Sequence, residues 1–311
     1  MATLATGCSG FIDNQAATST LKILQASQTA ALRVPDVELA RAALPGGILQ
    51  LDAFAIAYPK RREFRVLHAM ALCQYATAFV FDDWETATLA ARSDEAAHAA
   101  DRLAPLLASC VDANLELLPP AWRAARVRGP DAVVALMPSA TRAQVPQLIA
   151  IATADASRLA LAPFARLADL PMIRAMLERA TALLPGALEA RGELLLGTLA
   201  AGQSQFMGGD DGSAYFQRAR TLAGEQNLLV DVLYARAVAV AHGDRALFET
   251  TLARVLAADV TRWPDRRLPN AIARQKAQRY LDAEGTLLPP PAPPTPPGSG
   301  ASDGRLPTPG S

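Results

Sequence analysis

The amino-acid sequence predicts an all-α protein built from stacked, antiparallel helical hairpins. Of its 311 residues, 51% are hydrophobic but only 5% are aromatic. Ala and Leu fill most of the apolar positions, which favours close-packed helices over β-sheets. Apolar residues also recur at helical spacing through most of the chain. Prolines and glycines interrupt this pattern at related intervals, so each interruption is expected to turn the chain into the next helix.

The first half of the chain is expected to form a series of helices separated by turns. In order, these helices are expected at residues 14–32, 37–44, 48–58, 62–81, 95–118, 144–161 and 172–184, with two short helices within 121–137. Pro45-Gly46-Gly47 is expected to end the second helix. The acidic stretch Asp82-Asp83-Trp84-Glu85 is interpreted as a solvated connector with Trp84 folded onto the core, and a partner-binding surface is the alternative.

The loop at residues 206–212 is the most informative part of the second half. Its glycines allow turn conformations that a Cβ resists, and an Asp can cap the helix that follows. A cation site is the alternative, but the loop lacks the recurring oxygen ligands and the terminal Glu of an EF-hand. We therefore expect Gly208, Gly209 and Asp210 to have a structural role. Further helices are expected up to Gly224 and at 227–241 and 245–258.

Small residues repeat at matching spacings in two pairs of segments. Ala219 and Ala253 lie 34 positions apart, which is the tetratricopeptide period. Segments 37–46 and 177–186 each place an Ala five residues before a Pro. A small side chain lets paired helices approach, and the Pro ends the helix. These repeats predict a tetratricopeptide-like α-solenoid, in which stacked hairpins build an extended surface.

The sequence contains no pattern typical of an active site or a metal centre. Nucleophile elbows, phosphate-binding loops and dinucleotide fingerprints are absent, and His68, His98 and His242 lie far apart. No catalytic residue, cofactor or metal is therefore expected, and the protein is predicted not to be an enzyme. With 30 basic and 30 acidic residues, the formal charge of zero argues against a nucleic-acid partner.

Two glycines lie inside a helical pattern, where each costs about 1 kcal/mol relative to Ala. These are Gly192 and Gly197. Close contact between helices is the favoured explanation, and a ligand lying against them is the alternative.

The three cysteines carry two different predictions. The segment that ends at Cys8 is similar to the end of a bacterial lipoprotein signal, which predicts lipidation of Cys8 and attachment to a membrane by that lipid alone. Cys73 and Cys110 each lie in an apolar helical pattern and are interpreted as buried small hydrophobes. Pairing in an oxidising compartment is the alternative. No further membrane span is expected, since the best candidate, residues 66–81, is shorter than the roughly 20 residues required.

Three regions are expected along the chain. Residues 1–13 are interpreted as a lipoprotein signal remnant and linker, and residues 14–284 as one all-helical domain. Residues 285–311 are rich in Pro, Gly and Ser, a composition that cannot bury a core. This last region is expected to be an extended, disordered tail.

Several stretches together resemble one protein family. They are residues 75–80, 171–185, 208–219, 244–257 and 267–277. The sequence is similar over roughly residues 14–281 to the TRAP-transporter-associated T component, or TatT, a family of bacterial lipoproteins with a tetratricopeptide-like fold. Two departures stand out: Ile149, Ile151 and Ala154 replace the family's aromatic residues, and 202–205 replaces a proline-containing segment. The resemblance therefore does not bring an aromatic-lined pocket to this chain.

The resemblance implies a non-enzymatic, periplasmic accessory component of a tripartite ATP-independent periplasmic (TRAP) transport system. Its implied partner is the solute-binding protein of that system, and its implied cargo is an apolar or organic-acid solute. A homo-oligomer is implied as well, with a trimer as the expected form. The alternative is a tetratricopeptide-like envelope lipoprotein that acts as a scaffold for protein interactions.

Overall fold

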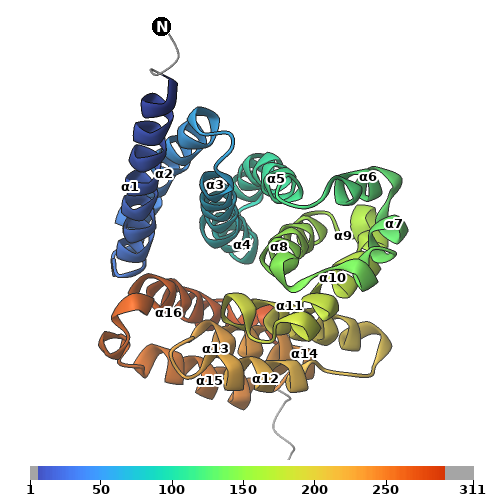
Figure 1. Ribbon diagram of the computed structural model, residues 1–311. Helices are drawn as coiled ribbons and strands as arrows, with labels where there is room; N and C mark the ends of the chain where they lie inside the picture. Colours follow the sequence, from blue (N-terminus) through green and yellow to red (C-terminus); the bar gives the residue numbers. More distant parts are fainter. Residues whose placement is uncertain (1–5, 291–311) are drawn as a thin grey trace, which may run out of the picture.

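The computed structural model describes residues 6–290, with backbone alone for residues 6–14, 206 and 207. This part of the chain is helical and contains no strand, which confirms the predicted all-α class. Helices α1 to α9 form an arc, and helices α11 to α16 form a second group below it, with α10 between the two (Figure 1). The tetratricopeptide-like stacking stays a prediction.

The helices of the first group alternate with short connecting turns. In chain order they are α1 (Thr6–Leu32), α2 (Val37–Ala57), α3 (Arg62–Tyr75), η1 (Ala76–Val80), α4 (Phe81–Leu89), α5 (Ser93–Leu115), α6 (Pro120–Arg128), α7 (Pro130–Val134), η2 (Met137–Ser139), η3 (Arg142–Gln144), α8 (Val145–Leu161), α9 (Pro163–Arg166), η4 (Leu167–Asp169) and α10 (Leu170–Leu183). Helices α3, η1 and α4 are continuous, and η1 is a π-helical turn.

The second group begins after Pro185. Its helices are α11 (Ala187–Met207), α12 (Ser213–Ala223), α13 (Leu229–Tyr234), η5 (Ala235–Ala239), α14 (Val240–His242), α15 (Arg245–Ala257), η6 (Val260–Arg262), η7 (Pro264–Arg266), α16 (Arg267–Asp282) and α17 (Glu284–Leu287). Helix α16 returns to the start of the chain, where it contacts α1 and α2.

Each group of helices has its own apolar core. In the first, Leu103 and Leu107 of α5 are fully buried with Leu148 of α8 and Ile173 of α10. These residues follow the helical spacing that predicted the elements, so one face of each helix supplies the core. The second core is centred on Phe248 and includes residues from α13, α15 and α16. Helix α16 contributes residues to both cores, and α11 joins the first core to a third one around Phe216.

Two segments that were predicted to connect helices are themselves helical. Helix α2 runs through Pro45 to Ala57 instead of ending at residue 44. The residues after Pro45 keep the helical period, and Leu51 packs with Phe64 in a small core shared with α1 and α3, so tertiary packing outweighs the Pro penalty. The expected solvated connector at residues 82–85 is helix α4, in which Asp82 is 8% exposed. Trp84 does pack against the core, as predicted.

The ends of the expected domain also differ from the structure. Helix α1 begins at Thr6 rather than at residue 14. At the other end, α17 covers Glu284–Leu287 and Leu288 is buried in the second core, so folded structure continues past residue 284. Residues 1–5 and 291–311, which include most of the expected tail, lie outside the described residues.

Cys73 of α3 and Cys110 of α5 form a disulfide bond. The interpretation of both as unpaired buried thiols was therefore wrong. Helices α3 and α5 pack side by side, which brings the two Cα atoms to 5.1 Å, within the range that a disulfide spans. Asn114 donates a hydrogen bond to the Cys110 carbonyl oxygen at 2.9 Å. The disulfide links α3 and α5 covalently across 37 residues of sequence.

The expected close contacts at the helical glycines are confirmed. A Cβ at Gly192 would lie 2.7 Å from Cγ2 of Thr181, and a Cβ at Gly197 would lie 2.8 Å from Cε2 of Phe216.

One of the two sequence repeats does not correspond to a structural repeat. Ala219 is fully buried, whereas Ala253 is exposed, so the two do not occupy equivalent packing positions.

Candidate functional site

A buried charge cluster joins α4 to α16 at the centre of the molecule. Asp82 and Glu85 are three residues apart and therefore share one face of α4. Lys276, Arg279 and Tyr280 share the facing side of α16. We call these five residues the α4–α16 cluster.

Every acidic group in the α4–α16 cluster is bonded to more than one partner. The Nζ of Lys276 lies 2.6 Å from Asp82 Oδ1 and 2.7 Å from Glu85 Oε2. The guanidinium of Arg279 donates to both oxygens of Asp82, at 2.9 and 2.7 Å, and to Glu85 at 3.1 Å. The hydroxyl of Tyr280 donates to Glu85 Oε1 at 2.7 Å. Two negative and two positive charges thus balance, as burial requires.

The cluster stabilises the charged forms of its two carboxylates and its two cations. Burial raises the pKa of the Tyr280 hydroxyl, which stays neutral. Burial alone would raise the pKa of Asp82, but Arg279 and Lys276 outweigh it and hold the pKa below its ordinary value. Burial would likewise raise the pKa of Glu85, and Lys276, Tyr280 and Arg279 lower it on balance. The pKa of Lys276, which burial would lower, is raised by Tyr280, Glu85 and Asp82. The arrangement suits a rigid connection between helices, because all charges are paired.

Asp83 extends this connection to the N-terminal hairpin. It accepts two hydrogen bonds from Nη1 of Arg41 on α2, at 2.7 and 2.8 Å. Asp83 of α4 therefore binds α2, whereas Asp82 and Glu85 bind α16. The acidic stretch at residues 82–85, which the sequence analysis interpreted as a connector, thus joins α4 to α2 and α16.

The loop expected to have a structural role is held by its own hydrogen bonds. Asp210 accepts from the N–H of Gly212 at 2.9 Å, and Asp211 accepts from the N–H of Ser213 at 2.9 Å. Gly208 and Gly209 have φ angles of 70° and 101°, which favour glycine. The Ser213 N–H is the main cause that lowers the pKa of Asp211, with His242 contributing. These contacts are those of a turn that leads into α12.

The remaining sequence predictions concern a lipid anchor and metal ligands. The backbone of Cys8 belongs to α1, and its side chain lies outside the described residues. Among the residues whose side chains are described, no group of three or more His, Cys, Asp or Glu is arranged to hold a metal ion. Ile149, Ile151 and Ala154 are buried core residues of α8.

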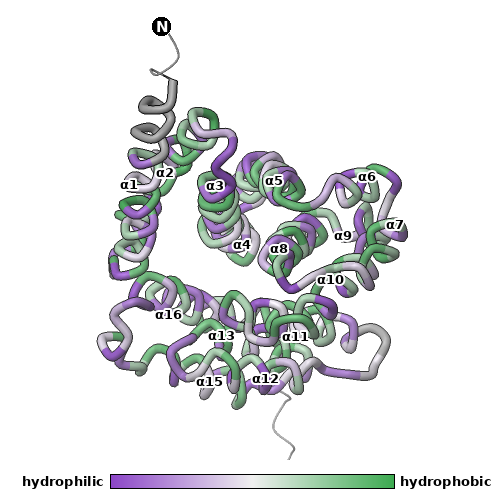
Figure 2. The backbone as a smooth tube through the Cα atoms, viewed as in Figure 1, coloured by the Kyte–Doolittle hydropathy of each residue, from purple (hydrophilic) through white to green (hydrophobic). Residues whose placement is uncertain are grey.

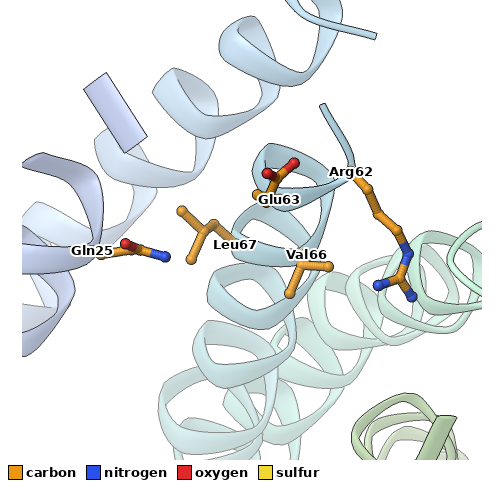
Figure 3. Close-up of a pocket in the computed structure, with 5 residues that line it drawn as sticks. All are labelled: Gln25, Arg62, Glu63, Val66 and Leu67. Carbon is orange, nitrogen blue, oxygen red and sulfur yellow. The ribbon is translucent and has the colours of Figure 1, made fainter. Parts of the chain in front are cut away.

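An open groove of about 360 Å³ lies between α1 and α3. It is lined by Gln25, Arg62, Glu63, Val66 and Leu67. Figure 3 shows that Leu67 points from α3 toward Gln25, whereas Arg62 points to the other side of α3. Arg62 donates to the carbonyl oxygen of Leu117 at 3.0 Å. The polar groups of this groove do not converge on a common point.

Helix α2 exposes an apolar face. Leu39, Leu49 and Ile56 are 58%, 72% and 72% exposed, and Figure 2 shows hydrophobic residues along this helix. By length and composition alone, two of the described helices could cross a membrane: Val37–Ala57, with 11% of its most apolar window buried, and Arg62–Leu89, with 50% buried. The segment 66–81, judged too short from the sequence, is part of the second of these helices. Of the two, α2 is the one with an uncovered apolar surface.

Sequence reasoning missed the α4–α16 cluster because its two halves lie more than 190 residues apart. A signal was present in the matching spacing, since Asp82 and Glu85 are separated by three positions, like Lys276 and Arg279. Many helices carry charges at that spacing, however. Nothing in a single sequence pairs these two helices.

The fold and its contacts define an all-α, disulfide-linked protein in which buried ion pairs join distant helices. The family model of the TRAP transporter T-component matches residues 33–287. The chain belongs to this family, which confirms the resemblance. Membership gives it an accessory role in a TRAP transport system and a periplasmic or membrane-associated setting. No curated protein matches the chain.

Proposed function

We propose that this protein is a non-enzymatic periplasmic accessory component that binds the solute-binding protein of a TRAP transporter. The observation that carries the proposal is the family match across residues 33–287. The disulfide between Cys73 and Cys110 supports the location, because structural disulfides persist in oxidising compartments such as the periplasm. The cargo is an apolar or organic-acid solute that the partner delivers or receives.

Attachment and assembly complete the proposal. A lipid on Cys8 holds the protein at a bacterial membrane, and copies of the chain assemble into a homo-oligomer, with a trimer as the expected form. The exposed face of α2 is the proposed contact between copies. Its exposed small and apolar residues recur at alternating intervals of three and four positions, the spacing of a seam along which two or three copies of one helix pack. These residues are Leu39, Ala42, Gly46, Leu49, Ala53 and Ile56.

Light scattering tests the partner directly. The full chain carrying Cys8→Ser, which prevents lipidation, is measured alone and mixed with a TRAP solute-binding protein from the same organism. We expect an oligomer that takes up the solute-binding protein. A protein that stays free of the solute-binding protein but captures envelope peptides would instead favour the scaffold alternative.

Cell fractionation tests the anchor separately. In a full-length precursor, Cys8→Ser is expected to move the protein from the membrane fraction to the soluble periplasmic fraction. A protein that keeps its membrane association after this change is not anchored through Cys8.

A further inference from the structure

A second, smaller pocket lies where the chain breaks between α8 and α10. Its volume is about 240 Å³, and it is lined by Arg126, Pro130, Arg158, Arg166, Asp169 and Met172. These residues come from α6, α7, α8, α9, η4 and α10. Pro163 begins α9 directly after α8, so the chain turns here and brings arginines from separate helices together. We call this site the arginine pocket.

The arginine pocket has more positive than negative charge. Arg126 Nη2 and Arg158 Nη1 both approach Asp155 Oδ1, at 2.6 and 3.4 Å, behind the pocket wall. Arg166 Nη1 lies 3.2 Å from Asp169 Oδ2. Three guanidinium groups therefore share two carboxylates, so these five groups together carry an excess of one positive charge.

Most N–H groups of these three arginines have no acceptor among the residues that the structure describes. A guanidinium has about five N–H donors, and the three arginines direct few of theirs to protein acceptors. Arg126 donates to Asp155 and to the sulfur of Met172, and Arg158 and Arg166 each donate to one carboxylate. The side chains of the three arginines keep 20 to 33% exposure, so solvent and small solutes can reach them.

The electrostatics favour an added negative charge. Burial, followed by repulsion from Arg166 and Arg126, lowers the pKa of Arg158 despite the nearby Asp155 and Asp169. An anion beside these arginines would relieve that repulsion. One excess positive charge matches a monovalent anion better than a divalent one, because Asp155 and Asp169 would repel a second negative charge.

We propose that the arginine pocket binds a small carboxylate anion. The planar guanidinium groups match the two oxygens of a carboxylate, and Pro130 lines the pocket beside them. The volume is below the roughly 300–1,000 Å³ of pockets that hold drug-sized ligands, so the occupant is small. This site is separate from the α2 face and from the α4–α16 cluster. The choice of a carboxylate rests in part on the organic-acid cargo of the proposed function, whereas binding of the anion requires no solute-binding protein.

Isothermal titration calorimetry of the full chain with Cys8→Ser tests the arginine pocket. Propionate is the carboxylate probe and inorganic phosphate is the competing anion. We expect one propionate site with a Kd on the order of 1 mM or below, given the few atoms of the probe. Arg166→Gln should weaken binding by about tenfold or more, since it removes hydrogen bonds to a charged group. Asp169→Asn should tighten it, since it removes a negative charge.

The matched control is Arg142→Gln, which removes the same charge at the opposite end of α8, where Arg142 is exposed. This change should alter propionate affinity by less than about twofold, because screening is strong over that distance. The absence of propionate binding, tighter binding of phosphate, or an equal loss in Arg142→Gln would each overturn the proposal. The partner assay above is independent of these outcomes. Circular dichroism confirms that each variant is folded.

Discussion

At the scale of single residues, Asp82 is the group on which the central charge balance depends most. It contacts both Lys276 and Arg279 in a buried setting. Asp82→Asn leaves these two cations facing Glu85 alone, and removing one partner of a buried ion network typically costs about 3–5 kcal/mol. We expect a loss of that order in urea unfolding. Asp52→Asn is the control, because Asp52 is exposed on α2, and its effect should stay within about 0.5 kcal/mol.

The same cluster predicts how stability responds to acid. Asp82 and Glu85 have folded-state pKa values below their ordinary values of 3.8 and 4.5. Their contribution is therefore fully present above the ordinary pKa and is lost as the pH falls through the lowered one. The free energy of unfolding should decrease from about pH 5 downward. Asp82→Asn should show a shallower decrease, and an equal slope in both proteins would contradict this account.

Two glycines provide a matched pair for the packing of α11 against α12. Gly212 has a φ of 80°, and a Cβ there would overlap the carbonyl oxygen of Gly197. Gly212→Ala should therefore destabilise the protein by about 2 kcal/mol or more. Gly202→Ala, within α11 and with nothing near its Cβ position, should stabilise it by up to about 1 kcal/mol. Thermal unfolding measures both, and equal effects would refute the close contact.

At the scale of helices, the disulfide fixes α3 beside α5. In the chain-entropy account, a loop of 37 residues closed by a disulfide contributes about 4 kcal/mol. The double substitution Cys73→Ala and Cys110→Ala should lower the free energy of unfolding by up to about 4 kcal/mol. Urea unfolding in a Cys8→Ser background measures this change. In that background, denatured protein without reductant should show no free thiol in a thiol assay. Two reactive thiols would mean that the bond does not form.

Helix positions were predictable wherever the apolar spacing was regular and the turn chemistry was strong. The break between the helices expected at 227–241 and 245–258 and the close contact at Gly197 follow from local chemistry and are found in the structure. The prediction was wrong at Pro45, where packing of Leu51 sustains the helix. It was wrong again at Asp82, whose burial depends on a helix near the other end of the chain.

The sites could not be predicted from the sequence, because each of them also depends on how separate helices pack. Cysteine spacing did not show that Cys73 and Cys110 meet, because the contact depends on how α3 and α5 pack. The arginine pocket likewise combines residues from several helices, none of which carries a recognisable motif. What the sequence supplied directly was the family resemblance, which rests on the order of several short stretches along the chain.

At the scale of the whole molecule, the exposed face of α2 is expected to control assembly. Leu49→Asp together with Ile56→Asp places two charges on the proposed seam and should weaken self-association by tenfold or more, since buried unpaired charges are costly. Val127→Asp is the control, because Val127 is 85% exposed on α6. Sedimentation velocity would measure the change. An oligomer unaffected by the double substitution would exclude this face.

The α4–α16 cluster can form only after the C-terminal part of the chain has been synthesised. Helices α3 and α5 are close in sequence, so their disulfide can form as soon as this part of the chain reaches an oxidising compartment. Asp82 and Glu85 of α4 must wait for Lys276 and Arg279, which are synthesised near the end. Until then, these carboxylates have no cation from α16 and remain hydrated. Helix α16 therefore completes this connection late, and a chain interrupted before α16 keeps two exposed carboxylates where the finished protein has paired charges.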